Sequence, residues 1–160
     1  MPIRAAAITV SDSRDASNDE GGARLCERLQ AHGCEVTVRE LVRDEPGQIA
    51  AALQRVCDED LAELVVFTGG TGIAPRDQTY EALAPLLEKR LDGFGEAFRR
   101  LSWEQVGAKA VLSRALAGTH RGKLVVALPG SPKAVVLGVD EVLAPIMQHA
   151  LKLLAGGGKH

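Results

Sequence analysis

The chain has 160 residues, a formal net charge of −2, 46% hydrophobic residues and 25% charged residues. These values predict one soluble globular domain, which should bury roughly 70% of its unfolded surface. The small negative charge argues against a general nucleic-acid binder, because affinity for a phosphate backbone depends on clustered Lys and Arg. Three cysteines without a CxxC pair, no signal peptide and no apolar run of roughly 20 residues predict a cytoplasmic protein with no membrane segment.

The first half of the chain alternates between strand-like and helix-like patterns. Short apolar runs predict buried strands, and apolar residues three or four positions apart predict helices. The predicted elements are a strand over 5–10, a helix from Glu20 to about Gly33, a strand over 34–41, a helix from Pro46 and a strand over 64–67.

The second half continues this alternation less regularly. We expect helices over 79–88, 95–101 and 106–114, an edge strand over 115–118, a buried strand over 124–128, and a helical stretch over 132–154 that Pro145 kinks or splits. Strands that alternate with helices predict an α/β fold, a three-layer α/β/α arrangement with a mostly parallel central sheet. We assign residues 1–155 to one domain and expect 156–160 to form a disordered tail.

Three of the predicted strands run directly into polar or glycine-rich loops. The segment SDSRD follows Val10, GGTG follows Thr68, and PGSP follows Leu128. Ligands of parallel sheets bind beyond the carboxyl ends of the strands. We therefore expect these three loops to open on the same edge of the sheet and to form one site.

The loop GGTGIAPRD carries the strongest local signal. Gly69, Gly70 and Gly72 lack Cβ atoms, so their backbone can approach a ligand, and the following helix would present free N–H groups to an anion. A tight glycine-rich turn is the structural alternative, but Thr71 and Arg76 favour a phosphate-binding loop. Neither GxGxxG nor the lysine of a P-loop is present.

Two aspartates are candidates for organising a metal ion. Asp77 stands where the next helix should begin, and Asp44 follows the second strand, just before Pro46. Either residue could simply cap a helix. Placed at one sheet edge, two separated carboxylates could instead hold Mg²⁺ against bound phosphates, as phosphoryl or nucleotidyl transfer requires.

Further polar residues could complete the site or serve only as turn and surface residues. Hydroxyl groups, carboxylates and glycines at loop and helix starts can bind a phosphate or satisfy the local backbone. These candidates are Ser11, Asp12, Ser13, Glu96, Gly130 and Ser131.

Six segments together resemble the MogA/MoaB family of molybdenum cofactor biosynthesis proteins. They are TVSDSR, VRDE, GGTGIAPRD, GFGEAFR, LSRALAG and LPGSP, in this order, and the resemblance spans roughly Ile3 to Leu154. It implies the molybdopterin-binding, MogA-like fold and adenylylation of molybdopterin by Mg-ATP with release of pyrophosphate.

Carried over to this chain, the resemblance implies that Asp44 and Asp77 are the catalytic, Mg²⁺-organising pair. Gly69, Gly70, Thr71 and Gly72 would contact phosphates. It further implies a homotrimer or hexamer, and transfer of the product to a molybdate-inserting protein, in either a molybdenum or a tungsten pathway.

The match is closer to the MoaB branch, some of whose members resemble non-catalytic relatives. A molybdopterin-binding protein without turnover is therefore the alternative to an enzyme, and an oligomeric scaffold is a third, weaker reading. Asp92 and Arg43 depart from the family pattern, since proline is common at both positions. The retention of Arg76, Asp77 and Asp44 favours an enzyme.

Overall fold

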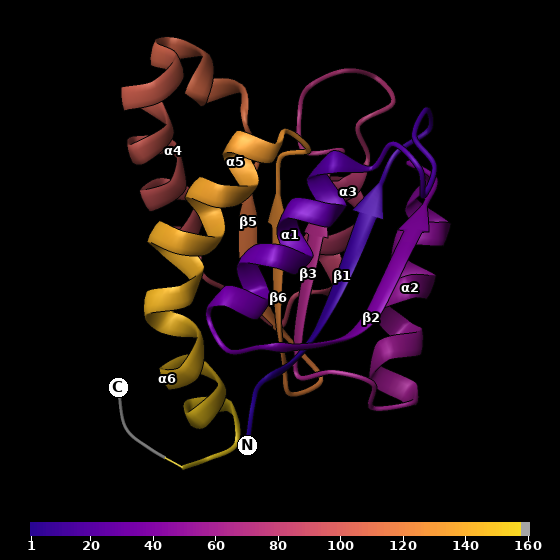
Figure 1. The fold of residues 1–160 in the computed structure, drawn as a ribbon, viewed down its shortest axis with the longest axis vertical. Coiled ribbons are helices and arrows are strands. Elements are labelled where there is room, and N and C mark those ends of the chain that lie inside the picture. Colours follow the sequence, from indigo (N-terminus) through magenta and orange to yellow (C-terminus); the bar gives the residue numbers. More distant parts are fainter. Residues whose placement is uncertain (158–160) are drawn as a thin grey trace.

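The computed structural model describes residues 1–157, which form a six-stranded sheet with helices on both faces (Figure 1). The strands are β1 (Arg4–Val10), β2 (Glu35–Val42), β3 (Leu64–Thr68), β4 (Lys89–Arg90), β5 (Leu116–His120) and β6 (Lys123–Leu128). The helices are α1 (Glu20–Ala31), α2 (Pro46–Asp58), α3 (Thr79–Leu83), α4 (Asp92–Val106), α5 (Pro132–Leu137) and α6 (Ala144–Leu154).

The strand order in the sheet is β2-β1-β3-β6-β5-β4. The four neighbouring strands β2, β1, β3 and β6 run parallel to one another. β5 is antiparallel to both β6 and β4. The prediction of a three-layer α/β/α fold with a mostly parallel sheet is therefore confirmed.

The central strands are buried on both faces, which explains why they are apolar at every position. In β3, Leu64 and Val66 join a cluster with the apolar sides of α1, α4, α5 and α6. The alternate residues Val65 and Phe67 join a second cluster with α2 and α3. Successive side chains of a strand point to opposite faces, so an unbroken apolar run can serve two cores.

The helical region after the glycine-rich loop differs from the sequence prediction. The helix expected over 79–88 ends at Leu83 and continues as a 3₁₀ turn, Ala84–Leu86, which contains a proline. In place of two helices over 95–101 and 106–114, the chain forms the 15-residue helix α4 and then a 3₁₀ turn, Gly107–Leu112. Gly107 has φ of 70°, a conformation that ends a right-handed helix.

The strand expected at the sheet edge is not the edge strand. β5 lies between β6 and β4, and β4 pairs with it antiparallel through Lys89 and Arg90. Both residues of β4 are exposed, so the sequence has no apolar pattern that predicts this short strand.

The last helical stretch is split just before Pro145, as expected. A π-helical turn, Gly138–Leu143, separates α5 from α6, because proline has no N–H to continue the hydrogen-bond ladder. The whole helical stretch 132–154 is long and apolar enough to cross a membrane, judged by length and composition alone. Val135, Val139 and Leu143 of this stretch are fully buried in the cluster that also contains strand residues of the sheet.

Two residues of the expected tail, Gly156 and Gly157, form a hydrogen-bonded turn directly after α6. The amides of Gly156 and Gly157 donate hydrogen bonds to the carbonyls of Leu153 and Lys152. The remaining residues of that tail, 158–160, lie outside the described residues.

Candidate functional site

The three loops selected from the sequence lie at one edge of the sheet. β1, β3 and β6 are parallel neighbours that end at the same level of the sheet, with Thr9 opposite Thr68 and Thr68 opposite Leu128. The amide of Gly69 donates to the carbonyl of Leu128 at 2.9 Å, which fastens the GGTG loop to the end of β6. This edge is the upper end of the molecule in Figure 1, where the arrowhead of β1 lies.

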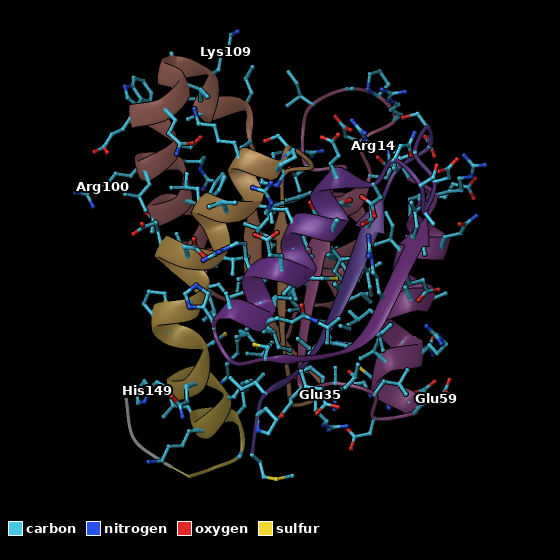
Figure 2. All side chains as sticks on the ribbon, viewed as in Figure 1. Arg14, Glu35, Glu59, Arg100, Lys109 and His149 are labelled. Atoms are coloured by element: carbon cyan, nitrogen blue, oxygen red, sulfur yellow. The ribbon has the colours of Figure 1, made fainter. Side chains whose placement is uncertain are left out.

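A cavity of about 430 Å³ opens between these loops, and we call it the strand-edge cleft. Among its lining residues are Ser11, Ser13, Arg14, Arg76, Gly130 and Ser131. Figure 2 places Arg14 at this end of the molecule, whereas Glu35 and Glu59 lie at the opposite end. Five predicted site residues, from all three loops, therefore line one cleft.

The glycines of the GGTG loop are required by close approaches of the backbone. Gly69 has φ of 104°, and an added Cβ would lie 2.2 Å from the carbonyl oxygen of Val10. Gly70 has φ of 68°, and its Cβ would lie 2.3 Å from Oγ1 of Thr79 and 2.8 Å from Oδ2 of Asp44. Any side chain at Gly70 would therefore displace the candidate metal ligand Asp44.

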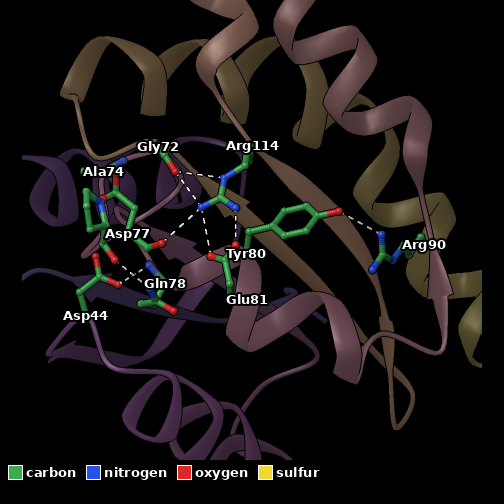
Figure 3. Close-up of polar contacts among 10 residues, drawn as sticks. Asp44, Gly72, Ala74, Asp77, Gln78, Tyr80, Glu81, Arg90 and Arg114 are labelled. Atoms are coloured by element: carbon green, nitrogen blue, oxygen red, sulfur yellow. Dashed lines mark hydrogen bonds and ion pairs between the residues drawn. The ribbon is translucent and has the colours of Figure 1, made fainter.

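Asp44 is fixed between two of the loops. Its Oδ1 accepts a hydrogen bond from the amide of Gln78 at 2.8 Å, and its own amide donates to Oδ1 of Asp12 at 2.9 Å. Gln78 follows Asp77 directly, so this bond holds the backbone next to Asp77 against Asp44, and the two carboxylates are near enough to interact electrostatically (Figure 3). Asp12 thereby joins the loop after β1 to the loop after β2.

The electrostatics of Asp44 suit a cation. Burial raises the pKa of Asp44 above its ordinary value, and the neighbouring carboxylates of Asp77 and Asp12 raise it further. The Gln78 amide and Arg76 act in the opposite direction. A divalent cation would relieve this repulsion, and carboxylate oxygens are the ligands that Mg²⁺ prefers.

The carboxylates do not form a complete metal cage. Within residues 1–157, no group of three or more His, Cys, Asp or Glu side chains could hold a metal ion. Mg²⁺ usually keeps several waters and binds through one or two carboxylates together with substrate phosphates. A carboxylate pair such as Asp44 and Asp77 would therefore need further oxygen ligands, such as those of a bound phosphate, to hold Mg²⁺.

Some candidate hydroxyl groups also have structural partners. Oγ of Ser11 accepts from the amides of Ser13 and Arg14 at 3.2 and 3.0 Å, and Oγ of Ser131 accepts from the amide of Ala134 at 3.2 Å, capping α5. These contacts use the oxygens only as acceptors, so each hydroxyl keeps a hydrogen to donate to a ligand in the cleft.

Glu96 lies in a different place. It lines a second cavity of about 620 Å³ beside β5 and α4, which we call the arginine cavity because Arg90, Arg99 and Arg114 line it. Asp77 and Arg114 both line a smaller cavity of about 290 Å³. Arg114 therefore connects the surroundings of Asp77 to the arginine cavity.

Two residues of this region received no role from the sequence. Arg114 hydrogen-bonds the GGTG loop, and Ser113 lines the arginine cavity. Oγ of Ser113 is the only buried side-chain oxygen or nitrogen among the described residues without a hydrogen-bond partner in the protein, so it is available to a water or a ligand. The sequence pattern predicts a helix over 106–114, whereas Ser113 and Arg114 lie in the link between the 3₁₀ turn Gly107–Leu112 and β5.

Comparison with known proteins shows the family. A family described as "Probable molybdopterin binding domain" matches residues 6–149. Molybdenum cofactor biosynthesis protein B of Staphylococcus aureus (strain COL) is 44% identical over 152 residues, which cover 93% of this chain and 90% of that protein.

Solved structures agree with the sequence comparison. A crystal structure of a molybdenum cofactor biosynthesis protein B is 38% identical, covers 98% of both chains and has a TM-score of 0.94. The tungsten cofactor synthesizing protein MoaB from Pyrococcus furiosus is 37% identical, with a TM-score of 0.86 over 96% of this chain and 97% of its own.

Proposed function

The chain belongs to the MogA/MoaB family of molybdopterin-binding, molybdenum cofactor biosynthesis proteins, and from this membership we propose that it adenylylates molybdopterin. In this reaction the terminal phosphate of molybdopterin attacks the α-phosphate of ATP. A new phosphoanhydride bond forms, the bond between the α- and β-phosphates breaks, and pyrophosphate leaves. The product is adenylyl-molybdopterin.

One observation carries this proposal: the hydrogen bond from the Gln78 amide to Asp44. It joins the loop that contains Asp77 to the loop that contains Asp44, beside glycines that leave room for phosphates. Transfer of a nucleotidyl group depends mainly on positioning and on neutralising charge, and this arrangement offers both.

Residues of the loops at this sheet edge would bind the metal ion and the phosphates. Asp44 and Asp77 would hold Mg²⁺, which when bound neutralises charge on the triphosphate. Arg76, at the rim of the strand-edge cleft, would pair with phosphate oxygens, and the hydroxyls of Ser11, Ser13 and Ser131 would donate to them. The strand-edge cleft, which Arg76 lines, and the arginine cavity, which Glu96 and Arg114 line, are two separate cavities that could receive the two substrates.

We place this reaction in the cytoplasm and expect the product to pass to a molybdate-inserting protein. Cys26, Cys34 and Cys57 are all free and buried, in keeping with a reducing compartment. The same site chemistry would serve a tungsten pathway, because the metal oxyanion enters after adenylylation.

The test is to incubate the purified protein with molybdopterin and Mg-ATP and to measure adenylyl-molybdopterin and pyrophosphate. We expect both products in equal amounts. Asp77→Asn should lower the rate about 100-fold or more, because it removes charge from the metal site. It should change the Kd for molybdopterin less than about threefold, since the amide keeps the shape and can still accept from the Ala74 amide.

Asp58→Asn is the matched control, because Asp58 is exposed at the end of α2, where it forms an ion pair with Arg121. It should leave the rate unchanged. Tight binding of molybdopterin without either product would reject the enzyme and support the non-catalytic binding protein. A wild-type rate for Asp77→Asn would remove Asp77 from the mechanism.

A further inference from the structure

Arg114 reaches from the link just before β5 to the GGTG loop. Its backbone amide donates to the carbonyl of Thr71 at 2.9 Å. Its Nε and Nη2 donate to the carbonyl of Gly72 at 3.0 and 2.7 Å, and Nη2 also lies 3.3 Å from the carbonyl of Asp77 (Figure 3). The Arg114 side chain thus holds the loop at two points, Gly72 and the candidate metal ligand Asp77.

The held backbone is in direct contact with the Asp77 carboxylate. A Cβ added to Gly72 would lie only 2.7 Å from Oδ2 of Asp77, and that same oxygen accepts from the Ala74 amide at 2.9 Å. A movement of Gly72 would therefore move or crowd the carboxylate. Because Arg114 binds the carbonyls of both Gly72 and Asp77, it fixes their relative position.

The guanidinium group of Arg114 is itself held by α3. It forms an ion pair with both carboxylate oxygens of Glu81, and it lies over the ring of Tyr80, 5.2 Å from the ring centre. The hydrogen bond from Arg114 lowers the pKa of Glu81, so the pair is charged at neutral pH. The orientation of Arg114 is thus determined before any ligand binds.

We propose that Arg114 is a positioning residue for Asp77, which fixes the GGTG loop in the geometry that Mg-ATP requires, with Glu81 orienting the guanidinium. This inference rests on the proposed function. Arginine is needed because a planar fork of donors can bind two carbonyls and a carboxylate together, whereas a lysine ammonium is a compact point charge.

The experiment compares Arg114→Gln and Arg114→Lys with the wild type at varied Mg²⁺. Misplacement of a catalytic group by about 1 Å can lower a rate about 100-fold. We expect kcat to fall about 100-fold in Arg114→Gln and about tenfold in Arg114→Lys, a higher Mg²⁺ concentration for half-maximal rate, and a KM for molybdopterin within about threefold of the wild type. Hydrogen exchange of the unliganded protein should be faster at the amides of residues 71–78 and unchanged in β3.

Arg121→Gln is the control, because it breaks an arginine–aspartate pair at the other end of β5, where Arg121 contacts Asp58 at 2.7 Å. It should change neither kcat nor exchange in the loop. Glu81→Gln should give a smaller loss than Arg114→Gln, and the double variant should be no slower than Arg114→Gln alone.

Three results would overturn the inference. The first is an unchanged kcat and Mg²⁺ dependence in Arg114→Gln. The second is unchanged exchange at residues 71–78, and the third is equally faster exchange in β3, which would show general destabilisation. A wild-type protein that makes no product would reject the proposed function alone, since loop exchange and Mg²⁺-dependent ATP binding by the Arg114 variants would still decide the role of Arg114.

Discussion

Asp44, the candidate metal ligand, is held in the folded protein at a cost in stability. It is half-buried, and its pKa is raised first by burial and then by the carboxylates of Asp77 and Asp12. A raised pKa means that the folded state disfavours the ionised form relative to the unfolded chain. Ionised Asp44 therefore destabilises the unliganded protein at neutral pH, and this destabilisation disappears as the pH falls and the carboxyl is protonated.

Asp44→Asn should therefore raise the Tm of the unliganded protein at pH 7. Relief of such a charge conflict commonly stabilises by about 0.5–1 kcal/mol, or about 1–4 °C for a chain of this length. The difference from the wild type should be largest at pH 7 and vanish below the ordinary aspartate pKa of about 3.9. Thermal unfolding followed by circular dichroism at several pH values measures it, and added Mg²⁺ should stabilise only the wild type.

Asp60 is the control, because its pKa is shifted in the opposite direction to that of Asp44. A hydrogen bond from Lys123, together with the charges of Lys123 and Arg4, lowers the pKa of Asp60, so its ionised form is favoured in the folded state. Asp60→Asn should not raise the Tm at pH 7. A Tm for Asp44→Asn equal to or below that of the wild type would show that the crowding of carboxylates does not strain the site.

At the scale of elements, the start of α1 is locked to β1 by a buried aspartate. Asp19 accepts from Oγ1 of Thr9 at 2.6 Å and from the amide of Gly22 at 2.9 Å, so it both caps the helix and joins it to the strand. A Cβ at Gly22 would lie 2.1 Å from Oδ2 of Asp19 and 2.4 Å from Oγ1 of Thr9. The cap leaves no room for a methyl group.

Two glycine-to-alanine substitutions should therefore have opposite effects on stability. Gly22→Ala should lower the free energy of unfolding by about 2–3 kcal/mol, because either the cap or the helix must shift. Gly47→Ala, in the first turn of α2 with nothing within 4 Å of an added Cβ, should raise it by about 0.5 kcal/mol. Urea unfolding measures both, and a stability of Gly22→Ala equal to that of Gly47→Ala would contradict the packing of α1 on β1.

The elements that the sequence predicts well are those whose pattern follows from burial. Residues 64–67 and 124–128 are apolar throughout because both faces of the central strands are covered, and observed β3 and β6 differ from the prediction by a residue or so. By contrast, β4 consists of two exposed basic residues, and its pairing with β5 follows from how α4 returns to the sheet rather than from local preference. Tertiary packing decides such short edge strands.

The candidate site also contains residues that the sequence predicts and residues that only the tertiary structure reveals. Asp44 and Asp77 could be placed near each other because residues that follow parallel strands share an edge of the sheet. The role of Arg114 could not be predicted, since it depends on a contact 42 residues away along the chain, between Arg114 and the carbonyl of Gly72. Glu96 lies in the arginine cavity and not in the strand-edge cleft, and only the path of α4 beside β5 determines this.

At the scale of the whole molecule, large apolar side chains gather on the surface at the end of α4 and on the turn after it. Trp103, Val106, Val111 and Leu112 are 51%, 47%, 64% and 50% exposed, although they lie within ten residues of one another. Soluble proteins seldom expose such a group of apolar residues unless it is an interaction surface. We expect second copies of this chain to cover it in a homotrimer or a hexamer.

Light scattering coupled to size-exclusion chromatography tests this assembly. The wild type should have three or six times the mass of the 16.9 kDa chain, and Val111→Glu with Leu112→Glu should reduce the mass to that of a monomer, because burying two carboxylates at an interface is unfavourable. Ile146→Glu is the control, since Ile146 is 39% exposed on α6, away from this surface in the sequence. A wild-type mass in the double variant, or a monomer only in Ile146→Glu, would place the interface elsewhere.

Because Val111 also lines the arginine cavity, a covered surface at Val111 and Leu112 would narrow that cavity, and assembly would then contribute to the site.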